Sequence, residues 1–230
     1  YRLDVLVDEP DVSPLAVQGP LAEELMARVF GDAVRAIRFF RFGWFDFQGV
    51  SMAVARSGYS KQGGYEIYVD GTQNGMPLWN ALMEAGKDLD VHAGCPNLIE
   101  RIEGGLLSYG NDMTRENTPH ECGLGRFCST QTAIGCVGRD ALLRVAKEGP
   151  TQQIRAIAIE GDIPLCDQVW PIMAKGKRIG QVTSAAKSPD FETNVAIGMV
   201  RMTHWDEGTA LEVHTQDGPR NATVHENFWI

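Results

Sequence analysis

The chain has 230 residues, a length that suits one or two domains with sizeable hydrophobic cores. Its net charge of −9 argues against a nucleic-acid-binding function, because a phosphate backbone would be repelled on average. Hydrophobic residues make up 43% of the chain without any run of about 18 apolar residues, so no membrane span is predicted. The first residues also lack the basic start and apolar stretch of a signal peptide.

The first part of the chain predicts strands interleaved with helices. Residues 21–30 carry apolar side chains on one helical face between Pro20 and Gly31, which are typical of a helix start and a helix end. The aromatic run 39–47 and the segment 50–56 predict a hairpin around Gln48-Gly49. The remaining predicted elements here are a strand at 12–19, a strand at 65–69 and a helix at 76–85.

The pattern changes in the second part of the chain. A helix is predicted from Cys95-Pro96-Asn97 onward, then a polar loop at 108–125 and a helix from Gly138 to Lys147. Short alternating strands follow at 154–160, 177–184, 194–200 and 210–215. The predicted fold class is therefore α+β, an antiparallel sheet with flanking helices, followed by an all-β barrel-like domain.

The cysteine pattern argues against disulfide or zinc scaffolds. The five cysteines are odd in number, and no two are spaced as C-x-x-C. We therefore expect reduced and mostly buried thiols in a cytoplasmic protein, with no metal site.

The stretch RSGYSKQGGYEIYV, residues 56–69, places a glutamate inside a strand directly after a glycine-rich turn. Glu66 either points to water while its neighbours face the core, or faces a pocket and accepts two N–H donors from a flat heterocycle. In the second case Tyr59 and Tyr68 would be flat walls, and the glycines would let the backbone approach the ligand. Arg101 is likewise open to two interpretations, a surface arginine or a partner for a ligand carboxylate or for Glu66.

Several segments, read in order, resemble one family. PLAVQGPLAEEL (14–25), the glycine-rich turn and strand (56–69), ERIEGGLLSYGNDM (100–113), TPHECGLGRFC (118–128), VGRDALL (137–143) and GQVTSAAKSPDFETNVAIGMV (180–200) resemble motifs of the glycine-cleavage T-protein (aminomethyltransferase) family. The resemblance covers nearly the whole chain in collinear order. It implies tetrahydrofolate as the cofactor and a family acidic residue upstream of this chain, so no catalytic residue is assigned here.

Departures from the T-protein pattern, such as SKQGGYEIY, CPNLIERIEGG and CDQVWP, resemble a branch that demethylates dimethylsulfoniopropionate. That resemblance implies methyl transfer from this small sulfonium substrate to N5 of tetrahydrofolate. It implies that Glu66, Tyr59 and Arg101 bind the cofactor, and that Tyr68 and Trp170 bind the substrate. The alternatives are an aminomethyltransferase of the glycine cleavage system, a folate-binding module without turnover, and a non-binding structural domain.

The resemblance also predicts the organisation of the chain. Residues 1–106 are expected to be the C-terminal part of the folate-binding domain, 107–149 the remainder of a middle domain, and 150–230 the C-terminal barrel. The family's enzymes begin well before the strand at 12–19, so we expect an N-terminally truncated fragment whose activity alone is doubtful. A homodimer is a further expectation.

Overall fold

The computed structural model describes residues 4–95, 98–129, 136–225 and 227–229. The chain divides into two compact units, Tyr1–Pro96 and Asn97–Ile230, which are described separately below. The predicted three-part division at 106 and 149 stays a prediction. Among the described residues, no helix is both long and apolar enough to cross a bilayer.

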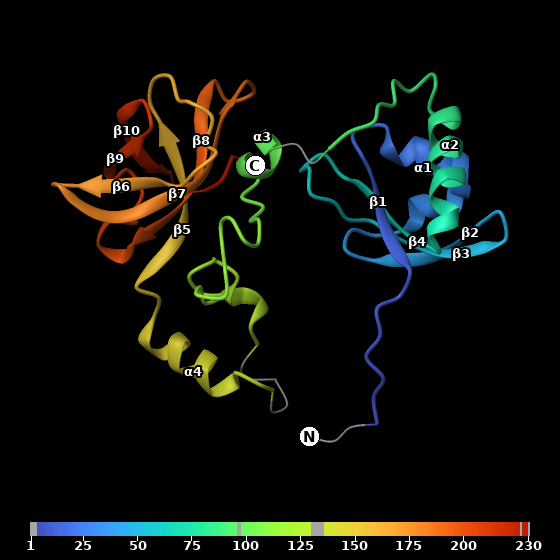
Figure 1. The fold of residues 1–230 in the computed structure, drawn as a ribbon, viewed down its shortest axis with the longest axis horizontal. Coiled ribbons are helices and arrows are strands. Elements are labelled where there is room, and N and C mark those ends of the chain that lie inside the picture. The colour runs from blue at the N-terminus through green and yellow to red at the C-terminus, as the bar shows by residue number, and fades with distance from the viewer. Residues whose placement is uncertain (1–3, 96–97, 130–135, 226, 230) are drawn as a thin grey trace. The chain divides into compact units, whose positions relative to one another are not determined.

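The first unit is a four-stranded antiparallel sheet with helices on one face, as predicted (Figure 1). Its strand order is β1-β4-β3-β2, so β4 and β3 are central and β1 and β2 form the edges. The strands are β1 (Val12–Gln18), β2 (Phe42–Phe47), β3 (Val50–Ala55) and β4 (Gly64–Asp70). The helices are α1 (Ala22–Phe30) and α2 (Gly75–Ala85), with short 3₁₀ turns at Asp32–Ala36 and Thr72–Asn74.

Strand alternation decides which face of this sheet is covered. In β4 the side chains of Tyr65, Ile67 and Val69 are buried in one core with residues of α1 and α2. The intervening side chains of β4 therefore point to the opposite face. Burial of each large apolar side chain contributes about 1.5–3 kcal/mol, which holds α1 and α2 on the core face.

The predicted hairpin is formed by β2 and β3. Gln48 and Gly49 both have positive φ, 53° and 85°, as a primed two-residue turn requires. The predicted strand start at Phe39 is wrong, because β2 begins at Phe42. Phe40 has a φ of 57°, a left-handed conformation that interrupts an extended strand.

The second unit contains a closed six-stranded antiparallel barrel with strand order β10-β5-β8-β7-β6-β9, which confirms the predicted barrel-like domain. Its strands are β5 (Gln152–Ile159), β6 (Trp170–Ala174), β7 (Lys177–Ser188), β8 (Thr193–Arg201), β9 (Ala210–Thr215) and β10 (Gly218–His225). The unit also contains α3 (Leu98–Glu103), the turn Gly125–Phe127 and α4 (Arg139–Glu148). The predicted helix start at 95–97 includes residues 96 and 97, which lie outside the described residues.

Two barrel strands, β6 and β10, were not predicted as strands. Each contains a proline, Pro171 or Pro219, which lowers the strand signal because proline cannot donate a ladder hydrogen bond. These strands nevertheless complete the barrel, since β6 joins β7 to β9 and β10 joins β9 to β5. α3 packs on β7 and β8 through Ile102, which is fully buried.

All five cysteines are free thiols, but the expectation that most are buried is wrong. Cys95 and Cys136 are exposed, and Cys122 is buried. Burial raises the pKa of the Cys166 thiol to about 11, so this side chain is protonated at neutral pH and is a poor nucleophile.

Candidate functional site

The uncovered face of the four-stranded sheet carries the predicted glutamate. Glu66 pairs with Ala16 on one side and with Ala55 on the other, and Ala55 pairs in turn with Phe42. One row across the sheet therefore reads Phe42, Ala55, Glu66, Ala16. The side chains of such a row lie on the same face of the sheet.

A second row on the same face runs parallel to the first. Tyr68 pairs with Pro14 and with Ala53, and Ala53 pairs with Trp44. Positions two strands apart in a row are separated by about 10 Å. Central β3 thus contributes a floor of two alanine methyl groups between an aromatic side, Phe42 and Trp44, and a polar side, Glu66 and Tyr68.

The aromatic residues of this face are strongly exposed for their type. Phe42 is 61% and Trp44 67% exposed, and their rings meet edge to face at 6.3 Å between centroids. Tyr68 is 41% exposed on the opposite side of the alanine floor. Exposed aromatic side chains that gather on one face are typical of a binding surface rather than a core.

Glu66 is half-buried, with one carboxylate oxygen held by a neighbour. The Ser57 hydroxyl donates a hydrogen bond to Glu66 Oε2. A carboxylate has about four lone-pair positions, so one bond leaves capacity for two further donors. Of the two interpretations, the structure supports parts of each: Tyr65 and Ile67 do face the core, while Glu66 faces a surface lined by aromatic residues.

Tyr59 lies in the glycine-rich turn between β3 and β4 and is half-buried. The first unit thus brings together Glu66, Tyr68 and the turn that carries Tyr59. The two other predicted site residues, Arg101 and Trp170, belong to the second unit.

Arg101 is 5% exposed and binds protein groups. Its Nη1 donates to Asp112 Oδ2 at 2.6 Å, and its Nη2 donates to Ser184 Oγ at 2.6 Å. Of the two interpretations of Arg101, the surface arginine is wrong, because Arg101 and its partner Asp112 are both buried in the second unit. Its predicted folate contact stays a prediction.

Trp170 is 1% exposed and lies in the barrel core. Its indole N–H donates to Gln216 Oε1 at 2.7 Å, so its polar atom also has a protein partner. The predicted contact with the substrate stays a prediction, and the observed contacts are those of a core tryptophan.

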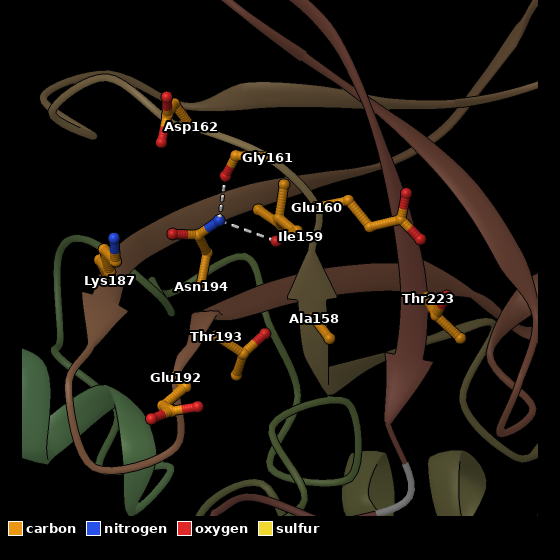
Figure 2. Close-up of a pocket in the computed structure, with 10 residues that line it drawn as sticks. All are labelled: Ala158, Ile159, Glu160, Gly161, Asp162, Lys187, Glu192, Thr193, Asn194 and Thr223. Carbon is orange, nitrogen blue, oxygen red and sulfur yellow. Dashed lines mark hydrogen bonds between the residues drawn. The ribbon is translucent and has the colours of Figure 1, made fainter.

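The hollow in Figure 2 lies where β5 ends and β8 begins and has a volume of about 430 Å³. Asn194 shapes it by donating to the carbonyls of Ile159 at 2.8 Å and Gly161 at 2.6 Å. Three carboxylates and one lysine line it, and no aromatic side chain does. It includes none of the five predicted site residues and offers no flat apolar wall, so it does not suit a pterin ring.

Three residues of the sheet face were missed from the sequence: Ser57, Phe42 and Trp44. The alternation in FGWFDF separates Phe42 and Trp44 from Phe45 and Phe47, which pack against the core. That alternation predicts that Phe42 and Trp44 lie on the opposite face of the strand from Phe45 and Phe47. It does not predict which of these two pairs shares a face with Glu66. Only the register of β2 on β3 and of β3 on β4 places them together.

Comparisons with known proteins place this fold in one class. Residues 4–132 match the family model of the GCVT N-terminal domain, and residues 153–229 match that of the glycine cleavage T-protein C-terminal barrel domain. The chain therefore belongs to the glycine cleavage T-protein family. This confirms the family expected from the sequence.

Within that family the chain is similar to a dimethylsulfoniopropionate demethylase DmdA from Ruegeria pomeroyi, at 63% identity over 98% of this chain and 62% of that protein. It is 30% identical over its full length to an aminomethyltransferase from Caldanaerobacter subterraneus, and covers 62% of that protein. A crystal structure of the glycine cleavage system aminomethyltransferase T from Bartonella henselae matches 94% of this chain and 59% of that one, with a TM-score of 0.77 and 25% identity. The chain thus spans about three fifths of the length of these relatives.

Proposed function

We propose that this chain contributes to a tetrahydrofolate-dependent demethylase that transfers a methyl group from dimethylsulfoniopropionate to N5 of tetrahydrofolate. The products would be 3-(methylthio)propanoate and 5-methyltetrahydrofolate. The single observation that carries the proposal is the position of Glu66 on a sheet face lined by aromatic side chains. The chain that holds this face is 63% identical to a dimethylsulfoniopropionate demethylase. We infer a cytoplasmic location for the same activity.

The residues of the sheet face fit the cofactor that the family implies. A carboxylate can accept two parallel N–H bonds from the amino-pyrimidine edge of a pterin. The alanine floor at positions 53 and 55 lets a flat ring approach the backbone next to Glu66. In this proposal Glu66 anchors the pterin and Tyr59 lines its edge.

The aromatic side chains on both sides of the alanine floor suit a cation. A sulfonium ion gains about 0.5–2 kcal/mol over each aromatic ring that it contacts. We assign this contact to Tyr68, as expected from the sequence, and to Trp44 and Phe42, which the structure adds. Arg101 and Trp170 carry less of the proposal, because their polar atoms bind Asp112 and Gln216.

The reaction asks the protein for alignment rather than for acid catalysis. Tetrahydrofolate, held by Glu66 and Tyr59, would supply N5 as the nucleophile for the methyl carbon, with release of the N5 proton. The carbon–sulfur bond breaks, and its electron pair goes to sulfur, which leaves as a neutral thioether. Because this leaving group needs no proton, the side chains of the site have to orient the two molecules and exclude water.

The test substitutes Glu66 by glutamine, which keeps the shape of the side chain and removes its charge. We expect the dissociation constant for tetrahydrofolate to rise at least tenfold, since a hydrogen bond to a charged group contributes about 1.5–3 kcal/mol. Binding is measured by quenching of tryptophan fluorescence, with Trp44 on the same face as a reporter. Asp70→Asn is the matched control, because Asp70 lies two residues beyond Tyr68 on the same face of β4.

Two results would contradict the proposal. One is wild-type-like folate affinity in Glu66→Gln, and the other is a failure of the natural full-length protein to form 5-methyltetrahydrofolate from dimethylsulfoniopropionate. The alternative, aminomethyl transfer, is supported by the likeness to several aminomethyltransferases at about 30% identity. It predicts turnover with an aminomethyl-loaded lipoyl carrier and none with the sulfonium compound.

A further inference from the structure

The carboxylate of Glu66 is tied to the strand next to it. Ser57 follows the end of β3, and its hydroxyl donates to Glu66 Oε2 on β4. The bond therefore spans two central strands on the uncovered face. A glutamate side chain has three rotatable bonds, so such a bond reduces the orientations that the carboxylate samples.

Ser57 is itself held by the last residue of β1. Gln18 Nε2 donates to the carbonyls of Ser57 at 3.1 Å and Tyr65 at 3.2 Å. Gln18 Oε1 accepts a hydrogen bond from the Ser60 hydroxyl at 2.8 Å. One amide side chain thus joins the beginning, the middle and the end of the glycine-rich turn.

Two glycines of the turn make room for this arrangement. A Cβ atom on Gly58 would lie 1.9 Å from Gln18 Oε1, and one on Gly64 would lie 2.3 Å from the carbonyl oxygen of Val17. Gly64 also has a φ of 145°, which other residues rarely adopt. The sequence suggested that these glycines admit a ligand, whereas in the structure Gln18 and the end of β1 approach them.

We propose that Ser57, held in place by Gln18, is a positioning residue that orients Glu66 for two-point binding of a diamine-like ring edge. This inference rests on the proposed function, because it assigns Ser57 to the same folate site. Two-point binding requires both carboxylate oxygens to face the ring edge in one plane. Orienting the carboxylate before binding lowers the entropy lost when the ring binds.

The experiment measures tetrahydrofolate binding to the natural full-length protein by fluorescence quenching. We expect Ser57→Ala to raise the dissociation constant about tenfold, the effect of one hydrogen bond to a charged acceptor. Ser57→Thr keeps the hydroxyl and should restore affinity to within about twofold of the wild type. Ser51→Ala is the matched control, because Ser51 is an exposed serine on β3 with its side chain on the same face.

A double-mutant cycle separates positioning from a merely structural role. If Ser57 acts through Glu66, Ser57→Ala should have no further effect on affinity in a Glu66→Gln background. A tenfold loss that persists in that background would overturn the inference, and so would an unchanged affinity in Ser57→Ala. Circular dichroism of each variant checks that the chain remains folded.

The two proposals fail in different ways in this experiment. Absence of quenching in the wild type would overturn the folate site and the role of Ser57 together. Wild-type binding that depends on Glu66 but not on Ser57 would overturn the positioning role alone.

Discussion

At the scale of single residues, Tyr65 lies in β4, the strand that contributes one face to the core and the other face to the candidate site. It precedes Glu66 and faces the core, where it is 1% exposed. Its hydroxyl has no hydrogen-bond partner among the described residues, although the Arg56 guanidinium lies 5.5 Å from the ring centroid. Burial raises the pKa of the Tyr65 phenol, and the Arg56 charge opposes part of that rise.

Tyr65→Phe should therefore leave the free energy of unfolding at pH 7 unchanged or raise it by about 1 kcal/mol, because it removes an unpaired buried hydroxyl. Above about pH 10 the unfolded phenol ionises before the folded one, so the wild type should lose stability as the pH rises. The Tyr65→Phe variant should lose less stability over the same rise in pH. Urea unfolding at pH 7 and pH 10.5 measures both effects, with exposed Tyr109→Phe as the control. A destabilised Tyr65→Phe would show that the hydroxyl is satisfied.

At the scale of elements, a buried polar network connects α3, the loop after it and β7. Asp112 accepts bonds from Arg101 at 2.6 Å, from Thr183 Oγ1 at 2.6 Å and from Ser184 Oγ at 2.7 Å. The register of β7 shifts between Val182 and Ser184, and such a bulge redirects neighbouring side chains. Both Thr183 and Ser184 can therefore reach the same carboxylate.

Asp112→Ala should lower the free energy of unfolding of the second unit by about 3–5 kcal/mol, because it leaves the buried Arg101 charge without its partner. Urea unfolding followed by circular dichroism measures the loss. Arg101→Met combined with Asp112→Leu removes both charges and should recover most of it. A loss below 1 kcal/mol in Asp112→Ala would show that water reaches the guanidinium.

At the scale of the whole molecule, the two units have separate hydrophobic cores. Leu78 and Met52 belong to the core of the first unit, whereas Val213 and Ile157 belong to the barrel core. Each unit therefore has buried apolar side chains that pack against others of the same unit. Cooperative unfolding units commonly coincide with such cores.

Leu78→Ala should cost the first unit about 2–5 kcal/mol through a cavity beneath the sheet. Hydrogen exchange should then accelerate in β1–β4 and stay unchanged in the barrel strands. Val213→Ala is the matched control and should produce the opposite pattern. Equal acceleration in both units after Leu78→Ala would show that they unfold together.

The family, the fold class and the position of Glu66 on a strand could be predicted from the amino-acid sequence. These follow from local information: periodicity, turn glycines and collinear motifs, which report on neighbours along the chain. Strands β6 and β10 escaped prediction because their proline-containing segments become strands through pairing with partners distant in sequence.

The surroundings of the predicted residues, in contrast, became known from the three-dimensional structure. Strand register brought Phe42 and Trp44 to the face of Glu66. The turn brought Ser57 to the Glu66 carboxylate, and Gln18 at the end of β1 binds the backbone carbonyl of Ser57. Folding also buried Arg101 against Asp112 and Trp170 in the barrel. The physical reason is that register, burial and hydrogen-bond partners depend on which distant segments pack together, and alternation along one strand does not contain that information.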